Sequence, residues 1–323
     1  MKQRPLLTIV MYHYVRDLSR SRYPGIKALT TSEFSGQLDF IQKHYTVCSG
    51  REVVAAVKGE SKLPQRACLL TFDDGFLDHF VTVFPMLEER GLTGCFFPPS
   101  KAIVERCLLG VHKLQLVLAV CEDAKALLEK VFHLLKPHRR HFEIPEDAEL
   151  WQRYAVEGKY DPIEIVLIKR LLQARLPEPV REDITDDLFR RNVAEDESVI
   201  VDEWYLTVPE LKTMHRHGME VGSHAHSHRF LETLSDQQQE QEILNSVELM
   251  LDIWGQKPSD WIMCYPAGSY DRRTIDILQR SGCAMGLAVE TGVVSNLKDP
   301  YTLPRLDTND LPFTENSESR WLR

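Results

Sequence analysis

The chain has 323 residues, of which 43% are hydrophobic and 27% are charged, and its formal net charge is −9. These values are ordinary for a globular protein, so they exclude a disordered or fibrous chain. The acidic balance also argues against a nucleic-acid binder, because contacts to phosphates require a basic face. The length suits one large α/β domain or two smaller ones.

The N-terminal residues predict a strand, with a signal peptide as the alternative. A secretory signal needs a basic start, an apolar core and a small-residue cleavage site. The apolar run within residues 6–15 is short and is interrupted by His13. No uncharged apolar run approaches the roughly 20 residues of a membrane span. We therefore expect a cytoplasmic protein with no membrane span.

The seven cysteines show no CxxC pair, and an odd number cannot be fully paired within one chain. Most lie in apolar stretches, as Cys68 and Cys95 do. This pattern predicts buried free thiols, which is typical of a reducing compartment.

The first hundred residues alternate between strand and helix patterns. Apolar runs predict strands at 6–15, 67–72 and 94–100, and helical spacing predicts helices at 32–44, with an N-cap such as Ser32, and at 81–90, before Gly91. Strand, helix and strand in steps of about thirty residues are typical of a parallel sheet or barrel.

A helical insertion interrupts this rhythm. Residues 101–200 contain two glycines, Gly110 and Gly158, and their leucines recur with helical period. From about residue 205 the alternation returns, with a long helix between Ser235 and Gly255 and strands around 219–224, 261–268 and 283–290. We predict a distorted (β/α)7-type barrel from residues 1–100 and 205–323, with 101–204 as the insertion, serving either as a lid or as a homo-oligomerisation surface.

Two predicted strand ends carry chemically active side chains. Asp73 and Asp74 follow the strand at 67–72, where they could cap a helix or form part of a site. His224 and His228 follow another strand, and two imidazoles four residues apart can bind one metal ion. Two histidines and one carboxylate leave open positions on the metal, as in catalytic sites. The second carboxylate would then accept a proton from water, which predicts metal-assisted hydrolysis.

These residues resemble a known family. The segments TFDDG at 71–75, SHAHSH at 223–228 and YPAG at 265–268 resemble the first three motifs of the polysaccharide deacetylases, carbohydrate esterase family 4. The resemblance covers roughly residues 5–100 and 205–308, and not the insertion. It implies removal of acetyl groups from N-acetylated sugars by water acting with a divalent metal, zinc by default, although cobalt, nickel or manganese would also suit these ligands.

The resemblance assigns a role to each matching residue. It implies that Asp73 is the general base and that Asp74, His224 and His228 bind the metal, whereas His226 lines the site. The turn of Tyr265, Pro266, Ala267 and Gly268 would line the substrate groove, with the Ala267 N–H holding the oxyanion.

The sequence departs from the family pattern in three ways. Cys264 stands where the third motif often has an arginine that braces the base. Arg305 is a candidate replacement, with an ordinary surface ion pair as the alternative. The late histidine that serves as general acid is missing, so His13 is the candidate, with His79 second and a buried structural role as the alternative for His13. The family's Asp-Trp motif is not evident.

A cytoplasmic member of such a family would meet small molecules, so we expect a small N-acetylated sugar or sugar nucleotide of surface-glycan biosynthesis as substrate. Two alternatives stay open. One is hydrolysis of another amide, such as a formyl group or a ring amide, and the other is a non-catalytic carbohydrate-binding relic.

Overall fold

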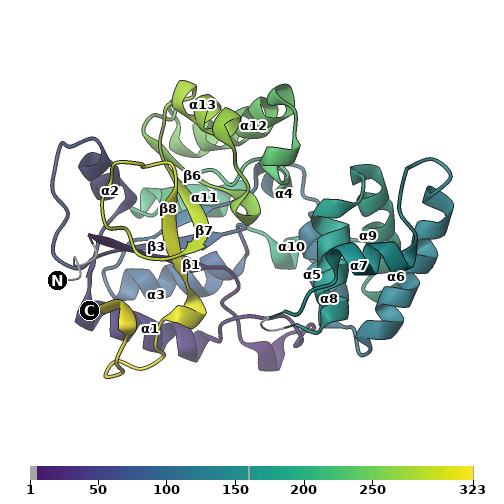
Figure 1. The fold of residues 1–323 in the computed structure, drawn as a ribbon. Helices are drawn as coiled ribbons and strands as arrows, with labels where there is room; N and C mark the ends of the chain where they lie inside the picture. The colour runs from purple at the N-terminus through teal and green to yellow at the C-terminus, as the bar shows by residue number, and fades with distance from the viewer. Residues whose placement is uncertain (1–5, 159–160, 323) are drawn as a thin grey trace. The chain divides into compact units, whose positions relative to one another are not determined.

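The computed structural model describes residues 6–158 and 161–322 (Figure 1). These residues form two compact units. Unit 1 comprises the described residues up to Asp17, Ala28–Cys107 and the chain from Val201 onward. Unit 2 comprises Leu18–Lys27 and Leu108–Ile200.

Unit 1 is built on one sheet whose strand pairs are all parallel. Its strands are β1 (Leu7–Tyr12), β2 (Thr46–Val47), β3 (Ala67–Asp73), β4 (Cys95–Phe97), β5 (Glu220–Val221), β6 (Trp261–Cys264), β7 (Cys283–Thr291) and β8 (Leu303–Asp307). Seven of them lie in the order β5-β4-β3-β1-β8-β7-β6, and β2 pairs with β3 outside this path. A parallel sheet of this kind places all carboxyl ends of its strands along one edge.

The two ends of the sheet meet just beyond β5. Ser223 forms a parallel bridge with Met263 of β6. The Ser223 N–H donates to the Ile262 carbonyl at 3.0 Å, and the Cys264 N–H donates to the Ser223 carbonyl at 2.8 Å. This contact closes the sheet and confirms the predicted distorted (β/α)7 barrel.

Helices surround the sheet of unit 1 (Figure 1). They are α1 (Thr31–His44), α2 (Gly50–Val57), α3 (Phe84–Glu89), α4 (Ser100–Val104), α11 (Val208–Arg216), α12 (Asp236–Trp254) and α13 (Arg272–Arg280). Shorter turns are the π-helix His79–Val83 and the 3-10 helices Leu231–Thr233, Pro266–Gly268, Thr308–Asp310 and Arg320–Leu322. The predicted helix at 81–90 is therefore a π-turn followed by α3.

The helix caps confirm one prediction and correct another. Ser235 caps α12, and Gly255 ends it in the left-handed conformation that favours glycine. The expected N-cap Ser32 is wrong, because Ser32 lies inside the first turn of α1. Thr30 is the cap: its hydroxyl accepts the Glu33 N–H, and the Glu33 carboxylate accepts the Thr30 N–H. This reciprocal pair satisfies two donors that the helix leaves unpaired.

Unit 2 is mainly helical, as the sequence predicted. Its helices are α5 (Gly110–Ala119), α6 (Ala124–His138), α7 (Asp147–Tyr154), α8 (Ile163–Arg170) with the π-turn Leu171–Arg175, and α9 (Glu178–Asn192), and α10 (Ser198–Trp204) spans the boundary with unit 1. Residues 18–27, with a 3-10 turn at Leu18–Arg20, also belong to this unit. Lys27 pairs with Asp161, and a side chain at Gly25 would lie 2.2 Å from the Ala119 carbonyl oxygen.

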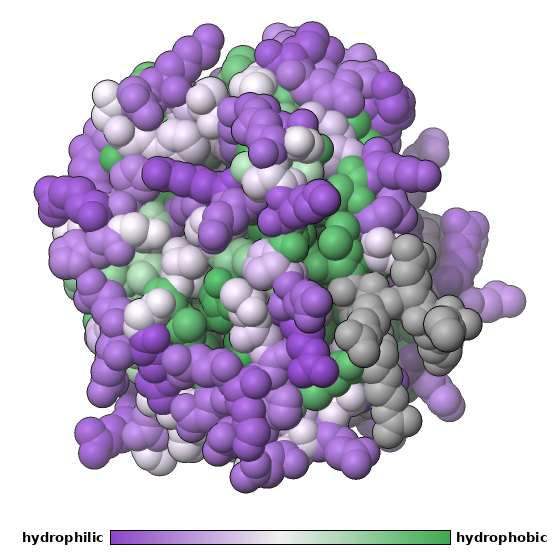
Figure 2. All heavy atoms as spheres, turned by 90° about the vertical axis from the view of Figure 1, so that its left-hand side faces the viewer, coloured by the Kyte–Doolittle hydropathy of each residue, from purple (hydrophilic) through white to green (hydrophobic). Residues whose placement is uncertain are grey.

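The interior of unit 1 is apolar, and its surface is largely polar. Leu7, Ile9 and Leu69 are fully buried members of one core cluster. Figure 2 shows a face that is hydrophilic over most of its area, with hydrophobic atoms gathered near its centre. Among the helices of the described residues, none has the length and hydrophobicity needed to cross a bilayer.

Candidate active site

Polar side chains gather at the carboxyl ends of the strands of unit 1. Asp73 ends β3 and Asp74 follows it, His224 and His228 follow β5, the turn 265–268 follows β6, His13 follows β1, and Arg305 lies in β8. Because these strands are parallel, the fold brings segments far apart in the chain to one edge of the barrel. The sequence-predicted residues therefore share one region.

Asp74, His224 and His228 form a group that could hold a metal ion. The Nε2 atom of His224 lies 3.4 Å from Asp74 Oδ1, and Nε2 of His228 lies 3.3 Å from the same oxygen. Asp74 and His224 are buried. Burial by itself would lower the pKa of His228, but its hydrogen bond to Asp74 and the nearby negative charges together raise the pKa above the ordinary value.

The spacing and the tautomer of this group both fit a metal ion. Two ligands held about 2.1 Å from a tetrahedral zinc lie about 3.4 Å apart, which matches the distances above. Nδ1 of His224 lies 2.8 Å from the Cys264 carbonyl oxygen. Since a carbonyl only accepts, Nδ1 carries the proton, and Nε2 of His224 presents its lone pair toward Asp74.

Asp73 is almost fully buried beside this group. Its Oδ1 accepts from Nη1 of Arg305 at 3.0 Å, and its Oδ2 lies 2.8 Å from Nη2 of the same guanidinium. Burial would raise the pKa of Asp73, but the charges of Arg305, His224 and His13, together with the hydrogen bond from Arg305, lower the pKa to about 2. The carboxylate is therefore ionised and ready to accept a proton.

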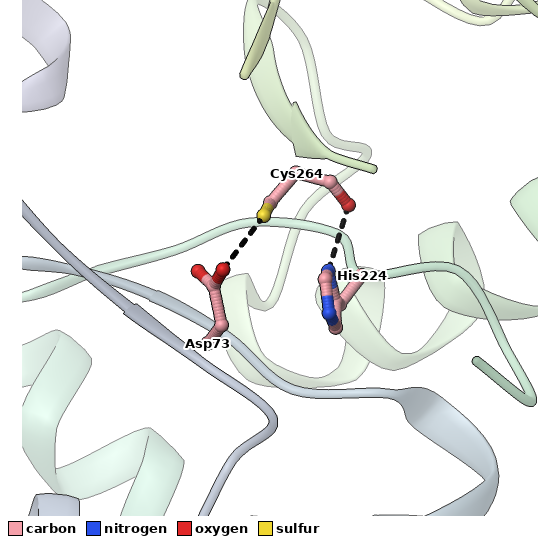
Figure 3. A group of neighbouring side chains, drawn as sticks. All are labelled: Asp73, His224 and Cys264. Carbon is pink, nitrogen blue, oxygen red and sulfur yellow. Dashed lines mark hydrogen bonds between the residues drawn. The ribbon is translucent and has the colours of Figure 1, made fainter. Parts of the chain in front are cut away.

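Arg305 is held by two further contacts, and Cys264 also contacts Asp73. Nε of Arg305 donates to the Ala288 carbonyl at 2.8 Å, and Nη1 donates to the Thr71 hydroxyl at 3.1 Å. The Cys264 thiol donates to Asp73 Oδ2 at 3.2 Å (Figure 3). Burial raises the pKa of this thiol well above its ordinary value, so the thiol keeps its proton.

A second group of possible ligands, Asp73, His224 and Cys264, lies next to the first (Figure 3). It fits a metal poorly, for two reasons. A metal binds the thiolate rather than the thiol, and this thiol is protonated. The carboxylate of Asp73 is also already paired with a buried guanidinium, which would repel a cation. The group of Asp74, His224 and His228 is therefore the better candidate for a metal site, and we call it the metal-binding group.

The two candidate general acids lie in different surroundings. Nε2 of His13 lies 3.9 Å from Asp73 Oδ2, and 41% of the His13 side chain is exposed. His79 is fully buried, and burial lowers its pKa to about 4. Its Nε2 donates to the His13 carbonyl at 2.9 Å. His79 thus supports the backbone of His13, and of these two histidines His13 is the exposed one.

His226 turns away from the metal-binding group. Its Nδ1 lies 2.9 Å from the Ser100 hydroxyl, and its Nε2 lies 3.3 Å from a Glu105 oxygen. These contacts attach it to α4 and to the residue that follows that helix. It is absent from both groups of possible ligands.

In the turn after β6, the aromatic ring of Tyr265 is buried and Ala267 is exposed. Tyr265 is fully buried, and its hydroxyl donates to the Tyr301 carbonyl at 2.9 Å. Its side chain is part of the core. The other three residues of the turn, Pro266, Ala267 and Gly268, therefore remain the candidates for contact with substrate. Pro266 is buried, whereas Ala267 is exposed with a left-handed backbone (φ 50°) and Gly268 is half-buried.

Sequence reasoning missed the residues that hold these loops in place. Glu242 of α12 is buried and accepts hydrogen bonds from the loop that carries His228. It stands among several other glutamates in a polar helix, so nothing in the sequence separates it from a surface residue. Thr71 belongs to the predicted strand and to the TFDDG segment, but the sequence gives it no role of its own.

The family comparison agrees with these segments. Residues 191–286 match the family model described as polysaccharide deacetylase. This range contains His224, His228 and the turn 265–268, whereas Asp73 and Asp74 precede it. The resemblance noted in the sequence to the polysaccharide deacetylases is confirmed.

Individual proteins are similar to this chain over most of its length. The "Putative polysaccharide deacetylase YxkH" of Bacillus subtilis (strain 168) is 20% identical over 301 residues, which cover 93% of this chain and 70% of YxkH. The deacetylase PplD of Streptococcus pyogenes, solved in complex with acetate, superposes with a TM-score of 0.57 at 17% identity, covering 94% of this chain and 92% of PplD.

Two further solved structures share the fold. IcaB from Ammonifex degensii gives a TM-score of 0.56 at 17% identity, covering 94% of this chain and 92% of IcaB. The deacetylase domain of BpsB from Bordetella bronchiseptica gives 0.54 at 16% identity, covering 95% and 97%. These likenesses show the fold, and the family model supports a carbohydrate deacetylase.

Proposed function

We propose that this chain is a metal-dependent hydrolase that removes an N-acetyl group from an amino sugar. One observation carries the proposal: an ionised, buried carboxylate, Asp73, lies beside a second carboxylate, Asp74, whose oxygen faces two imidazoles at metal-ligand spacing. A structural metal site would not need a separate base next to it.

Asp74, His224 and His228 would hold the ion, with zinc as the default and cobalt, nickel or manganese as alternatives. When bound, such an ion supplies a positive charge that polarises the amide carbonyl and acidifies water. Asp73 accepts the proton of the attacking water on its carboxylate. Arg305 and the Cys264 thiol hold that carboxylate in place through the contacts described above.

Two other groups would complete the reaction. The Ala267 N–H, at an exposed and left-handed position, donates to the oxygen that becomes negative as the amide carbonyl is attacked. His13 protonates the leaving amine, because it is the partly exposed histidine next to Asp73. Without this proton the leaving group would depart as an unstable amide anion.

We further propose a small N-acetylated sugar or sugar nucleotide as substrate. The chain leaves unit 1 for unit 2 after β1 and again after β4, that is, beyond the carboxyl ends of strands. Loops at this edge of a barrel form the rim of its active site. A mass-spectrometric screen of N-acetyl sugar nucleotides, sugar acids, oligosaccharides and long polymers tests this choice, and turnover of long polymer alone would contradict it.

We also propose a cytoplasmic location, and its support is the state of the thiols. All seven cysteines lie in the described residues, none of them forms a disulfide there, and five of them are buried. Free thiols are typical of a reducing compartment. Cell fractionation with labelling of unpaired thiols tests this proposal.

The metal requirement has its own experiment. Dialysis against a chelator should abolish deacetylation, and adding back Zn²⁺, Co²⁺, Ni²⁺ or Mn²⁺ should restore it to different degrees. His224→Ala and His228→Ala should each lose metal affinity, whereas His217→Ala, an exposed histidine, should not. Full activity after verified metal removal would refute the metal dependence.

A further inference from the structure

The loop 223–228, which we call the ligand loop, has an unusual backbone. Two of its residues other than glycine are in the left-handed region, Ala225 with φ 55° and His228 with φ 59°. Residues with a Cβ avoid this region unless surrounding contacts hold them there. Because His228 is itself one of these residues, the position of its imidazole depends on whatever holds the loop.

One buried carboxylate holds the amides of this loop. Glu242 of α12 is only 5% exposed. Its Oε2 accepts the N–H of His226 at 3.1 Å and that of Ser227 at 2.8 Å, while its Oε1 accepts the Ser227 hydroxyl. A carboxylate has several acceptor positions and no donor, so it can bind three donors of one loop at once.

Further contacts hold the same loop from both sides. Ser246, one helical turn after Glu242, lies 2.6 Å from the Ser223 hydroxyl, which in turn accepts the Ala225 N–H at 3.1 Å. The start of α4 binds carbonyl groups of the loop. The Ser100 N–H donates to the Ala225 carbonyl, and the Lys101 N–H donates to the His226 carbonyl. Amides of the loop thus face α12, and carbonyl groups face α4.

We propose that Glu242 is a positioning residue for the metal-binding group: it fixes the ligand loop so that His228 faces Asp74 and His224 before metal arrives. This inference rests on the proposed metal dependence. Groups that orient metal ligands from outside typically change metal affinity by 10- to 100-fold when removed. Glu242 acts through the backbone next to His228 and touches neither metal ligand nor substrate.

The experiment compares Glu242→Ala with Glu242→Gln. Alanine removes all three hydrogen bonds, so the dissociation constant for Zn²⁺, measured by chelator competition, should rise about 10- to 100-fold. Glutamine can still accept both amides on its oxygen and donate to the Ser227 hydroxyl, so its affinity should stay within about threefold of wild type. Glu248→Gln, at an exposed position of the same helix, is the matched control and should change nothing.

The visible absorption of bound Co²⁺ gives a second readout that a general loss of stability would not move. Glu242→Ala should alter the ligand-field spectrum, and Glu242→Gln should preserve it. If Glu242→Ala does not fold, Ser227→Ala removes the hydroxyl bond alone and should weaken Zn²⁺ binding several-fold. Equal losses in the alanine and glutamine variants would assign the effect to charge and overturn the proposal, as would unchanged affinity in Glu242→Ala.

A different set of results is expected if the proposed metal dependence itself is wrong. In that case the wild-type protein itself binds neither Zn²⁺ nor Co²⁺, and His228→Ala behaves as wild type does. Binding by the wild type that is lost in His228→Ala but unchanged in Glu242→Ala would reject the role of Glu242 alone.

Discussion

Arg305 and Asp73 form a fully buried ion pair in which both guanidinium Nη atoms face the carboxylate, at 3.0 and 2.8 Å. The two residues come from β8 and β3, which are separated in the sheet by β1. Removal of one partner of such a pair leaves a buried charge without compensation, which typically costs about 3–5 kcal/mol. The pair therefore affects both stability and the orientation of the proposed base.

Arg305→Ala should lower the free energy of unfolding by about 3–5 kcal/mol and abolish detectable turnover. Arg305→Lys should keep part of the stability but little activity, because an ammonium cannot reproduce the two-point contact. Urea unfolding and deacetylation assays measure the two effects. Arg272→Ala, at a largely exposed position, is the control and should change neither.

Cys264→Arg should destabilise the protein, because it places a second guanidinium in a buried region already occupied by Arg305. The double variant Cys264→Arg/Arg305→Ala should recover part of the stability and turnover, since one arginine again faces Asp73. Thermal unfolding and turnover of the two single variants and the double variant form a complete cycle. Strictly additive losses would show that the two positions do not share this role.

Asp73→Asn should reduce turnover by about 10²- to 10⁴-fold while the metal stays bound, because an amide cannot accept the proton. Metal content and turnover are measured on the same sample. Unchanged deacetylation would contradict the assignment of the base. The complete absence of turnover in the wild-type protein on all substrates would instead favour a carbohydrate-binding relic.

His13→Gln should lower turnover of N-acetyl sugars by about 10²- to 10⁴-fold. The loss should be much smaller for an aryl ester of acetic acid, because a phenolate leaves without being protonated. Rates on the two substrates are compared for the variant and for His141→Gln, an exposed histidine. An equal loss on both substrates would argue against His13 as the general acid.

His79 should make the folded state sensitive to acid. Burial lowers its pKa from 6.5 to about 4, so the unfolded chain binds a proton there more tightly than the folded one does. The stability that depends on neutral His79 is fully present above about pH 6.5 and is lost as pH falls toward 4. It adds up to about 1.4 kcal/mol per pH unit to the slope of unfolding free energy in this range.

Urea unfolding between pH 4.5 and 7.5 measures that slope for the wild type and for His79→Gln. The variant will be less stable at neutral pH, since it alters a packed core, but its slope should be flatter. Identical slopes would mean that His79 does not account for the acid sensitivity.

Much of the site could be predicted because its residues stand at strand ends. In a parallel barrel the register of each strand fixes where its last residue lies, so short motifs such as Asp73-Asp74 locate a shared edge. Arg305 could be named as a candidate on the same ground. The sequence did not reveal that the thiol of Cys264 donates to the base, because a buried cysteine is ordinarily inert.

Other features could not be predicted because they depend on packing between distant segments. Nothing in residues 18–27 marks them as part of the helical unit, since the pairing of Lys27 with Asp161 appears only after folding. The burial of Tyr265 was missed for a similar reason: a tyrosine in a turn can face either way, and here its hydroxyl reaches Tyr301. Glu242 is recognisable only from the loop it contacts.

The bridge between Ser223 and Met263 has a consequence for how the barrel opens. It is the point where the two outermost strands of the sheet meet, and the residue after Ser223 is His224, a proposed metal ligand. A metal ion held by His224 and by Asp74, the residue that directly follows β3, would connect that seam to a strand within the sheet. Metal occupancy should then slow hydrogen exchange at the amides of Ser223 and Cys264. The ion would stabilise the closed barrel in addition to taking part in the reaction.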